Sequence, residues 1–135
     1  MALTTDRNTP EIDGVMRQPG VATGVKIFAG SLVCLSATGV ATPGAVATTL
    51  KSLGRAEETV DNTAGADGAV TVKVKRGVFR FANSAAADEI TAAEIGSDCY
   101  VVDDQTVAKT NGANTRSVAG KVFNVDAQGV WVVFG

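Results

Sequence analysis

From Val25 to Phe134 the chain is a series of short segments with the pattern of β-strands, separated by glycine, proline, asparagine and aspartate. These segments are 25–28, 31–35, 39–42, 50–60, 69–82, 98–103, 106–109, 117–125 and 130–134. Several short strands at this spacing are typical of all-β sandwiches and barrels. Aromatic residues make up only 5% of the sequence, which favours thin, tightly packed strands over a large ligand pocket. We therefore expect one all-β domain body, a small barrel or sandwich, over residues 23–135.

The segments between the expected strands carry the residues that tight chain reversals need. They are ATGV at 37–40, ADGA at 66–69, TNGAN at 110–114 and DAQG at 126–129. Glycine supplies backbone conformations closed to other residues, and asparagine or aspartate hydrogen-bonds its own turn. We expect a turn at each of these places.

The longest segment, 69–82, changes its pattern midway. Valines at positions 70, 72 and 74 alternate with polar residues, which predicts that the valines face the core. After Arg76 and Gly77 the apolar side chains of Phe79 and Phe81 fall on the opposite parity. One extra residue at Arg76-Gly77, a β-bulge with a permissive glycine, would return all five apolar side chains to one face.

A bulge at that position would also place Lys73, Lys75 and Arg80 together on the outer face of the strand. A basic stripe of this kind is often simply a solvated surface. The functional alternative is a contact with an acidic protein surface. The sequence leaves both interpretations open.

One short helix is predicted near the middle of the chain. Thr91 followed by Glu94 has the spacing of a capping box, and Ile90 with Ile95 has the spacing of a hydrophobic staple. Gly96 stands where a left-handed residue would end the helix. The helix is therefore expected to be about one turn long.

The segment CYVVDDQTVAK, 99–109, places a thiol and two carboxylates beside an apolar run. Adjacent side chains of a strand point to opposite faces, so Asp103 and Asp104 could not serve one substrate there. The pattern instead predicts a hairpin that reverses at Asp104 and Gln105, with Cys99 packed inside. The chain contains no histidine, which removes the commonest general base and metal ligand. We expect neither enzyme activity nor a cofactor.

Other chemical motifs are also incomplete. Cys34 and Cys99 have no second ligand at metal spacing, and we expect two buried small hydrophobic residues in preference to a disulfide. VDNTAGADG at 60–68 superficially resembles an acidic calcium loop, but oxygen ligands do not alternate and no bidentate glutamate follows. A hairpin connection is the better interpretation. No glycine pattern has the spacing that binds phosphate.

Charge and hydropathy restrict the partners. The formal net charge is -2, so the chain lacks the basic field that neutralises nucleic-acid phosphates. No apolar run approaches the roughly 18 residues of a membrane span, and MALTTDRNTPE lacks the pattern of a signal peptide. We expect a soluble protein made in a cytoplasm, with neither nucleic acid nor membrane as a partner.

Residues 1–22 are expected to form an extended N-terminal arm. They contain Pro10 and Pro19, two glycines and alternating charges, with no period of 2 or 3.6 residues. Arms of this kind are usually frayed when free. We expect a neighbouring subunit or a partner surface to hold this one.

Most of the chain resembles the small head decoration, or capsid cement, proteins of tailed bacteriophages. The resemblance runs through DRNTPEIDG, GVKIFAGSLVCL, LKSLGRAEETVDN, GADGAVTVKVKRGVFRFANS, ITAAEIGSDCYVVDDQTVAKT and TRSVAGKVFNVDAQGVWV. No one piece is as specific as a set of zinc ligands. The order and combined length of the pieces carry the resemblance.

The resemblance implies a β-tulip-like body and a structural function. Such a protein binds the outer surface of an assembled icosahedral head, at junctions between major capsid proteins, and stabilises the shell. It is made in the bacterial host cytoplasm and ends on the outer capsid surface of the virion. We expect a closed homo-oligomer, a trimer in preference to a dimer.

Contact residues follow from this interpretation. The expected capsid contacts lie on the arm and are Thr5, Asp6, Arg7, Asn8, Thr9, Pro10 and Glu11. Subunit contacts are expected at Arg76, Gly77 and Arg80. Trp131 is expected in the core near the last strand, with an anchor of the subunit interface as the alternative. A different class of function, a carbohydrate-binding or adhesion module on a virion surface, would need exposed aromatics, and the chain has one Trp and one Tyr.

Overall fold

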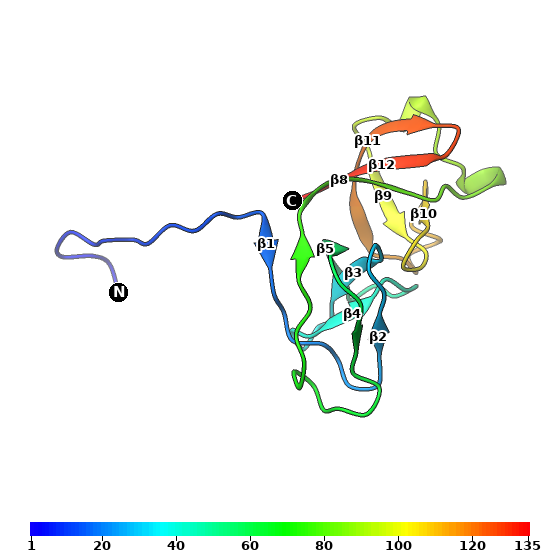
Figure 1. Cartoon of the computed structure of the whole chain (residues 1–135). Helices are drawn as coiled ribbons and strands as arrows, with labels where there is room; N and C mark the ends of the chain where they lie inside the picture. Colours follow the sequence, from blue (N-terminus) through cyan, green and yellow to red (C-terminus); the bar gives the residue numbers. More distant parts are fainter.

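The computed structural model describes all residues, 1–135, and its strands form three sheets (Figure 1). The first sheet has the order β1 (Met16–Arg17), β7 (Val74–Lys75), β5 (Lys51–Ala56), β3 (Leu32–Leu35), β4 (Ala41–Pro43). The second has the order β10 (Val107–Ala108), β9 (Asp98–Val101), β11 (Val118–Asp126), β12 (Gly129–Phe134), β8 (Gly77–Phe81). The third pairs β2 (Lys26–Ile27) with β6 (Val60–Asp61). The strand pairs are antiparallel, and the expected all-β fold is confirmed in its sandwich form.

The core consists of two clusters of buried side chains that meet at strand β3. Leu32 and Cys34 belong to the larger cluster, which fills the space against the second sheet. Val33 belongs to the smaller cluster, together with Val21 and Ile27. Successive side chains of a strand point to opposite faces. Strand β3 is therefore buried on both sides and joins the two halves of the sandwich.

Local turn chemistry sets the hairpins where the sequence predicts them. Gly39, with φ of 85°, lies in the turn between β3 and β4. In the β11–β12 turn, the Asp126 carboxylate accepts hydrogen bonds from the backbone N–H of Gln128 and Gly129 at 2.8 and 3.1 Å. Strands β9 and β10 pair around a turn in which Asp103 accepts from the Gln105 N–H at 2.9 Å. The predicted acidic hairpin is confirmed.

The change of pattern in segment 69–82 has a different origin from the expected bulge. Strand β7 belongs to the first sheet and β8 to the second, and the chain passes between them at Arg76 and Gly77. Gly77 has φ of 156°, which favours glycine. Val74 therefore packs in the smaller cluster and Phe81 in the larger. The single-face prediction is wrong because the two halves of the segment serve two sheets.

Two short 3-10 helices are the helical parts of the fold. They are η1 (Ala86–Asp88) and η2 (Ala92–Glu94). The predicted capping box is confirmed, since the Thr91 N–H donates to the Glu94 carboxylate at 2.7 Å. Gly96 follows with φ of 89°. Ile90 is buried whereas Ile95 is 47% exposed, so only the first member of the predicted staple anchors the turn.

No helix of the structure combines the length and the apolar character needed to cross a membrane.

The N-terminal segment divides into an extended part and a part attached to the body. Residues 1–14 are exposed and run away from the body, as the dark blue trace in Figure 1 shows. Strand β1 then pairs with β7, the Gln18 amide donates to the Thr71 hydroxyl at 2.9 Å, and Val21 is fully buried. The partners of residues 16–18 lie at positions 71–75, beyond the reach of any local pattern.

Candidate interaction surfaces

All of the residues expected to contact a capsid lie on the exposed part of the arm. Residues 5–11 are exposed, and residues 1–13 make no backbone–backbone hydrogen bond to the body. Within the arm, the Thr9 N–H donates to the Arg7 carbonyl at 3.1 Å. Most of its backbone groups are thus unpaired and available to a partner. Two apolar side chains are also uncovered, Leu3 at 72% and Ile12 at 83% exposure.

The arm leaves the body at a point that Arg76 holds. One guanidinium nitrogen, Nη1, donates to the Gly14 carbonyl at 3.1 Å, and Nη2 donates to the Gly135 carbonyl at 3.3 Å. The Arg76 N–H also donates to the Val15 carbonyl at 2.8 Å. Arg76, expected at a subunit contact, therefore has a contact within the chain: it ties the base of the arm to the last residue.

Trp131 and Arg80 lie side by side on the outer face of the second sheet. Val130 and Val132, the neighbours of Trp131, point into the core, so the indole points outward. The indole N–H donates to the Asp126 carboxylate at 2.9 Å, and the Arg80 guanidinium lies 5.6 Å from the ring centroid. This hydrogen bond is the main cause of the lowered pKa of Asp126. The prediction that Trp131 packs in the core is wrong.

A shallow groove of about 460 Å³ runs beside β8, between Lys75 of β7 and Arg80. Phe79 lines it, and the Arg55 guanidinium stacks on that ring at 4.2 Å from the centroid. Arg55 is itself bound by both carboxylate oxygens of Glu57. Neither Lys75 nor Arg80 forms an ion pair. The groove thus presents two positive charges without ion-pair partners, one on either side of the Phe79 ring, and not the single basic stripe that the sequence suggested.

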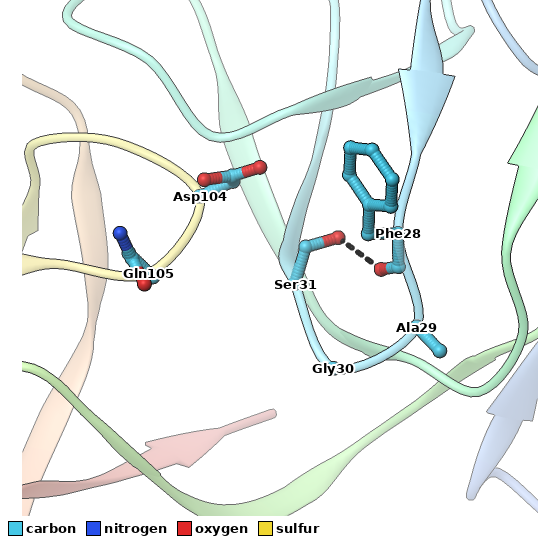
Figure 2. Close-up of a pocket in the computed structure, with 6 residues that line it drawn as sticks. All are labelled: Phe28, Ala29, Gly30, Ser31, Asp104 and Gln105. Carbon is cyan, nitrogen blue, oxygen red and sulfur yellow. Dashed lines mark hydrogen bonds between the residues drawn. The ribbon is translucent and has the colours of Figure 1, made fainter.

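A second hollow, of about 400 Å³, lies where the turn after β2 meets the β9–β10 turn (Figure 2). The Ser31 hydroxyl donates its proton to the Phe28 carbonyl at 2.7 Å and not to a carboxylate. The Asp104 and Gln105 side chains make no hydrogen bonds within the chain. Phe28 is 55% exposed, with Lys26 Nζ 5.0 Å from its ring centroid. The exposure of Phe28 has no signal in the sequence, because VKIF has the pattern of a buried strand.

The groups that first suggested an active site are separated in the structure. The Asp103 carboxylate closes its turn, while Asp104 lines the hollow. Cys34 and Cys99 are free and buried, as predicted. Burial raises the pKa of each thiol to about 12, so both are protonated near neutral pH and unreactive. No group of three or more His, Cys, Asp or Glu side chains is arranged to hold a metal ion.

The loop that superficially resembles a calcium site is held by one residue that the sequence did not single out. Asn62 is buried, and its amide nitrogen donates to the carbonyls of Val21, Ala22 and Ala66 at 2.9 to 3.0 Å. The Asp61 carboxylate accepts from the N–H and hydroxyl of Thr63, and these bonds lower its pKa. The loop therefore satisfies its own polar groups, as a connection does.

Two surfaces can thus meet another macromolecule: the arm, residues 1–14, and the groove beside β8. They lie on either side of Arg76, which contacts the base of the arm and immediately precedes β8. Comparisons of the chain with protein-family models, with curated proteins and with solved structures find no match.

Proposed function

We propose that this protein is a bacteriophage capsid decoration, or cement, protein. It binds the outer surface of the head at junctions between major capsid proteins and stabilises the shell. The single observation that carries this proposal is the arm: fourteen exposed residues projecting from the β body, with unpaired backbone groups. The resemblance of the ordered sequence pieces to decoration proteins supports the same function.

The arm supplies the contact with the shell in this proposal. Residues 5–11 combine acidic, basic and hydroxyl side chains on an extended backbone. An extended segment adds to an exposed sheet edge through main-chain hydrogen bonds, which place few demands on side chains. The body then rests on the shell as a compact cap. No chemical step is required of it.

Stabilisation follows from linkage. A ligand that binds the assembled shell and not its dissociated parts stabilises it by about 2.7 kcal/mol per site when its concentration is about a hundredfold above Kd. Many equivalent sites on one head multiply this effect. Joining copies around a symmetry axis adds avidity, and a trimer suits the local threefold junctions of a capsid lattice.

The test is binding to undecorated heads. Purified protein is mixed with heads and imaged by electron cryo-microscopy, together with a variant that lacks residues 1–13. The full chain is expected to give ordered density on the outer surface, and the shortened chain to bind at least tenfold more weakly. Gln128→Ala, in an exposed turn of the body, is the matched control and should bind as the parent does. Absence of ordered density with the full chain would refute the function.

A carbohydrate-binding module is the second candidate, and one observation favours it. Phe28 is exposed beside the free side chains of Asp104 and Gln105 (Figure 2). Small-molecule sites commonly combine aromatic side chains with a few polar groups that fix the ligand's orientation. Titration with oligosaccharides, followed by NMR, separates the two functions. Shifts at this hollow that vanish in Phe28→Ala would favour the module.

A further inference from the structure

Strand β8 forms one edge of the second sheet, with β12 on one side. On the other side the chain is paired just past the strand, where Ala82 bonds to Gln105 and Val107. Residues 78–81 make no backbone hydrogen bonds other than those to β12, and no side chain bonds to their backbone. One row of N–H and C=O groups therefore remains unpaired. Such an edge is a template for another strand. The groove between Lys75 and Arg80 is lined by four residues of this strand, Val78, Phe79, Arg80 and Phe81.

The arm has the register needed to pair with this edge. Strand β1 is antiparallel to β7, and the pairing extends one residue further, where the Arg76 N–H donates to the Val15 carbonyl. Each step along one strand matches one step back along the other. Continued in the same register, positions 13, 12 and 11 of an arm face positions 78, 79 and 80 of β8.

The side chains in this register are complementary. Glu11 would lie opposite Arg80 on the outer face, where Arg80 has no ion-pair partner. Ile12, 83% exposed in the arm, would lie opposite Phe79 on the inner face. Opposite charges and apolar pairs across strands stabilise a sheet. Pro10 follows at the end of the paired stretch, where the lack of an N–H stops a ladder.

The arm is turned away from the edge of its own chain. The Asp13 carboxylate accepts from the Val15 N–H at 3.3 Å, and Arg76 holds the Gly14 carbonyl. These bonds reverse the chain where a continued strand would have to follow β8 across to the second sheet. Figure 1 shows the arm leaving in the opposite direction. The edge of β8 is therefore not covered by the arm of its own chain and is open to the arm of another copy.

We propose that residues 10–13 of one copy add as a strand to β8 of a second copy. Glu11 then pairs with Arg80 of that copy, and Ile12 covers its Phe79. In this register Gly14 of the incoming chain comes beside Gly77, next to the base of the receiving chain's own arm. The bases of the two arms are then neighbours at the start of β8, and the exchange of an identical element between copies is a low-cost route to oligomers.

This inference deepens the proposed function and rests on it for its biological role, because it supplies the contact that closes the homo-oligomer. It also divides the arm: residues 10–13 hold a neighbouring copy, and residues 5–9 remain for the shell. The contact itself involves only copies of this chain. It can therefore be tested with no heads present.

Charge exchange tests the contact in solution. Sedimentation equilibrium is measured for the full chain, for Glu11→Lys, for Arg80→Glu and for the two changes combined. Each single change should weaken self-association about tenfold, and the combination should restore it to within about threefold. Lys51→Glu reverses an exposed charge at the far end of β5 and should change nothing. A monomeric full chain at millimolar concentration, or no rescue in the combined variant, would overturn the proposal.

A disulfide test identifies which chain provides the arm. Glu11→Cys protein is mixed with Arg80→Cys protein under mild oxidation; the native cysteines are buried and do not compete. Disulfide-linked mixed dimers are expected, and Glu11→Cys mixed with Lys51→Cys should give none above background. A double-cysteine chain that closes only on itself would show that the arm returns to its own body and would refute exchange. If no mixed dimers form but the protein binds heads normally, arm exchange is refuted and the decoration function stands. If mixed dimers form but the protein does not bind heads, the decoration function is refuted and arm exchange stands.

Discussion

The arm and the body use their backbones in opposite ways. In the body, the strands pair their N–H and C=O groups within three sheets, and two buried clusters fill the space between and beside them. In the arm, residues 1–13 have no backbone–backbone hydrogen bond to the body and every side chain is exposed. The body is stabilised by hydrogen bonds and burial within the chain, whereas the arm can form such interactions only with a partner. Substitutions in the two regions should therefore have very different effects on unfolding.

The largest loss of stability is expected from Gly54→Ala in β5. Gly54 has φ of 147°, and a methyl group there would collide with the carbonyl oxygen of Lys75 on the neighbouring strand. We expect a loss of about 3 to 4 kcal/mol in the free energy of unfolding, measured by urea denaturation. Gly39→Ala is the control, because its φ is 85° but its surroundings are open; about 1 kcal/mol is expected. Equal losses would mean that the collision is relieved by a small backbone shift.

Two leucines compare the regions directly. Leu32 is fully buried in β3, and Leu3 is 72% exposed in the arm. Leu32→Ala should cost about 3 kcal/mol because it removes buried methyl groups and leaves a cavity. Leu3→Ala should change the free energy of unfolding by less than about 0.5 kcal/mol. A comparable loss from both substitutions, in the same denaturation experiment, would show that the arm packs on the body.

A smaller, pH-dependent effect is expected from Asp126→Asn. The pKa of Asp126 is lowered by the Trp131 indole N–H and by the backbone N–H groups of its turn. Because the pKa of Asp126 is lower in the folded than in the unfolded protein, its ionised form stabilises the fold. This stabilisation is present above the pKa of the unfolded state, about 3.9, and is lost as the pH falls through the pKa of the folded state. The melting temperature of the parent should therefore exceed that of the variant at pH 6. The two should converge below pH 4, as measured by circular dichroism; a constant difference would contradict this assignment.

The smallest effect on folding is expected from deleting residues 1–13. These residues contribute to the body no buried side chain and only one exposed hydrogen bond, from the Val15 N–H to the Asp13 carboxylate, so the free energy of unfolding should change by less than about 0.5 kcal/mol. The same deletion should abolish self-association and weaken binding to heads. A loss above about 1 kcal/mol in dilute protein, where copies are separated, would mean that the arm belongs to the fold.

The sequence reveals those parts of the fold whose causes are local. The capping box at Thr91 and Glu94, the turn at Gly39 and the acidic hairpin each depend on residues a few positions apart, and all were predictable. The passage between sheets at Gly77 was detected as an irregularity but misinterpreted. A change of parity shows that the chain bends, whereas the sheet that it enters next depends on strands far along the sequence.

The candidate surfaces were less predictable, for the same reason. The position of residues 5–11 on an exposed arm was expected from the lack of any period. The outward position of Trp131 was not, because all five residues of VWVVF are apolar and the alternation alone does not show which set faces the core. The unpaired edge of β8 follows from the order of strands in the sheet. No pattern within GVFRF shows that one of its sides lacks a neighbour.

The position of strand β3 between the two core clusters determines how the protein unfolds. Leu32 and Cys34 complete one cluster, and Val33 completes the other, so losing this strand opens both at once. Neither half of the sandwich has a boundary along which it could separate and remain folded. The body should therefore unfold in a single cooperative step, with equal calorimetric and van't Hoff enthalpies, even though its interior is divided in two.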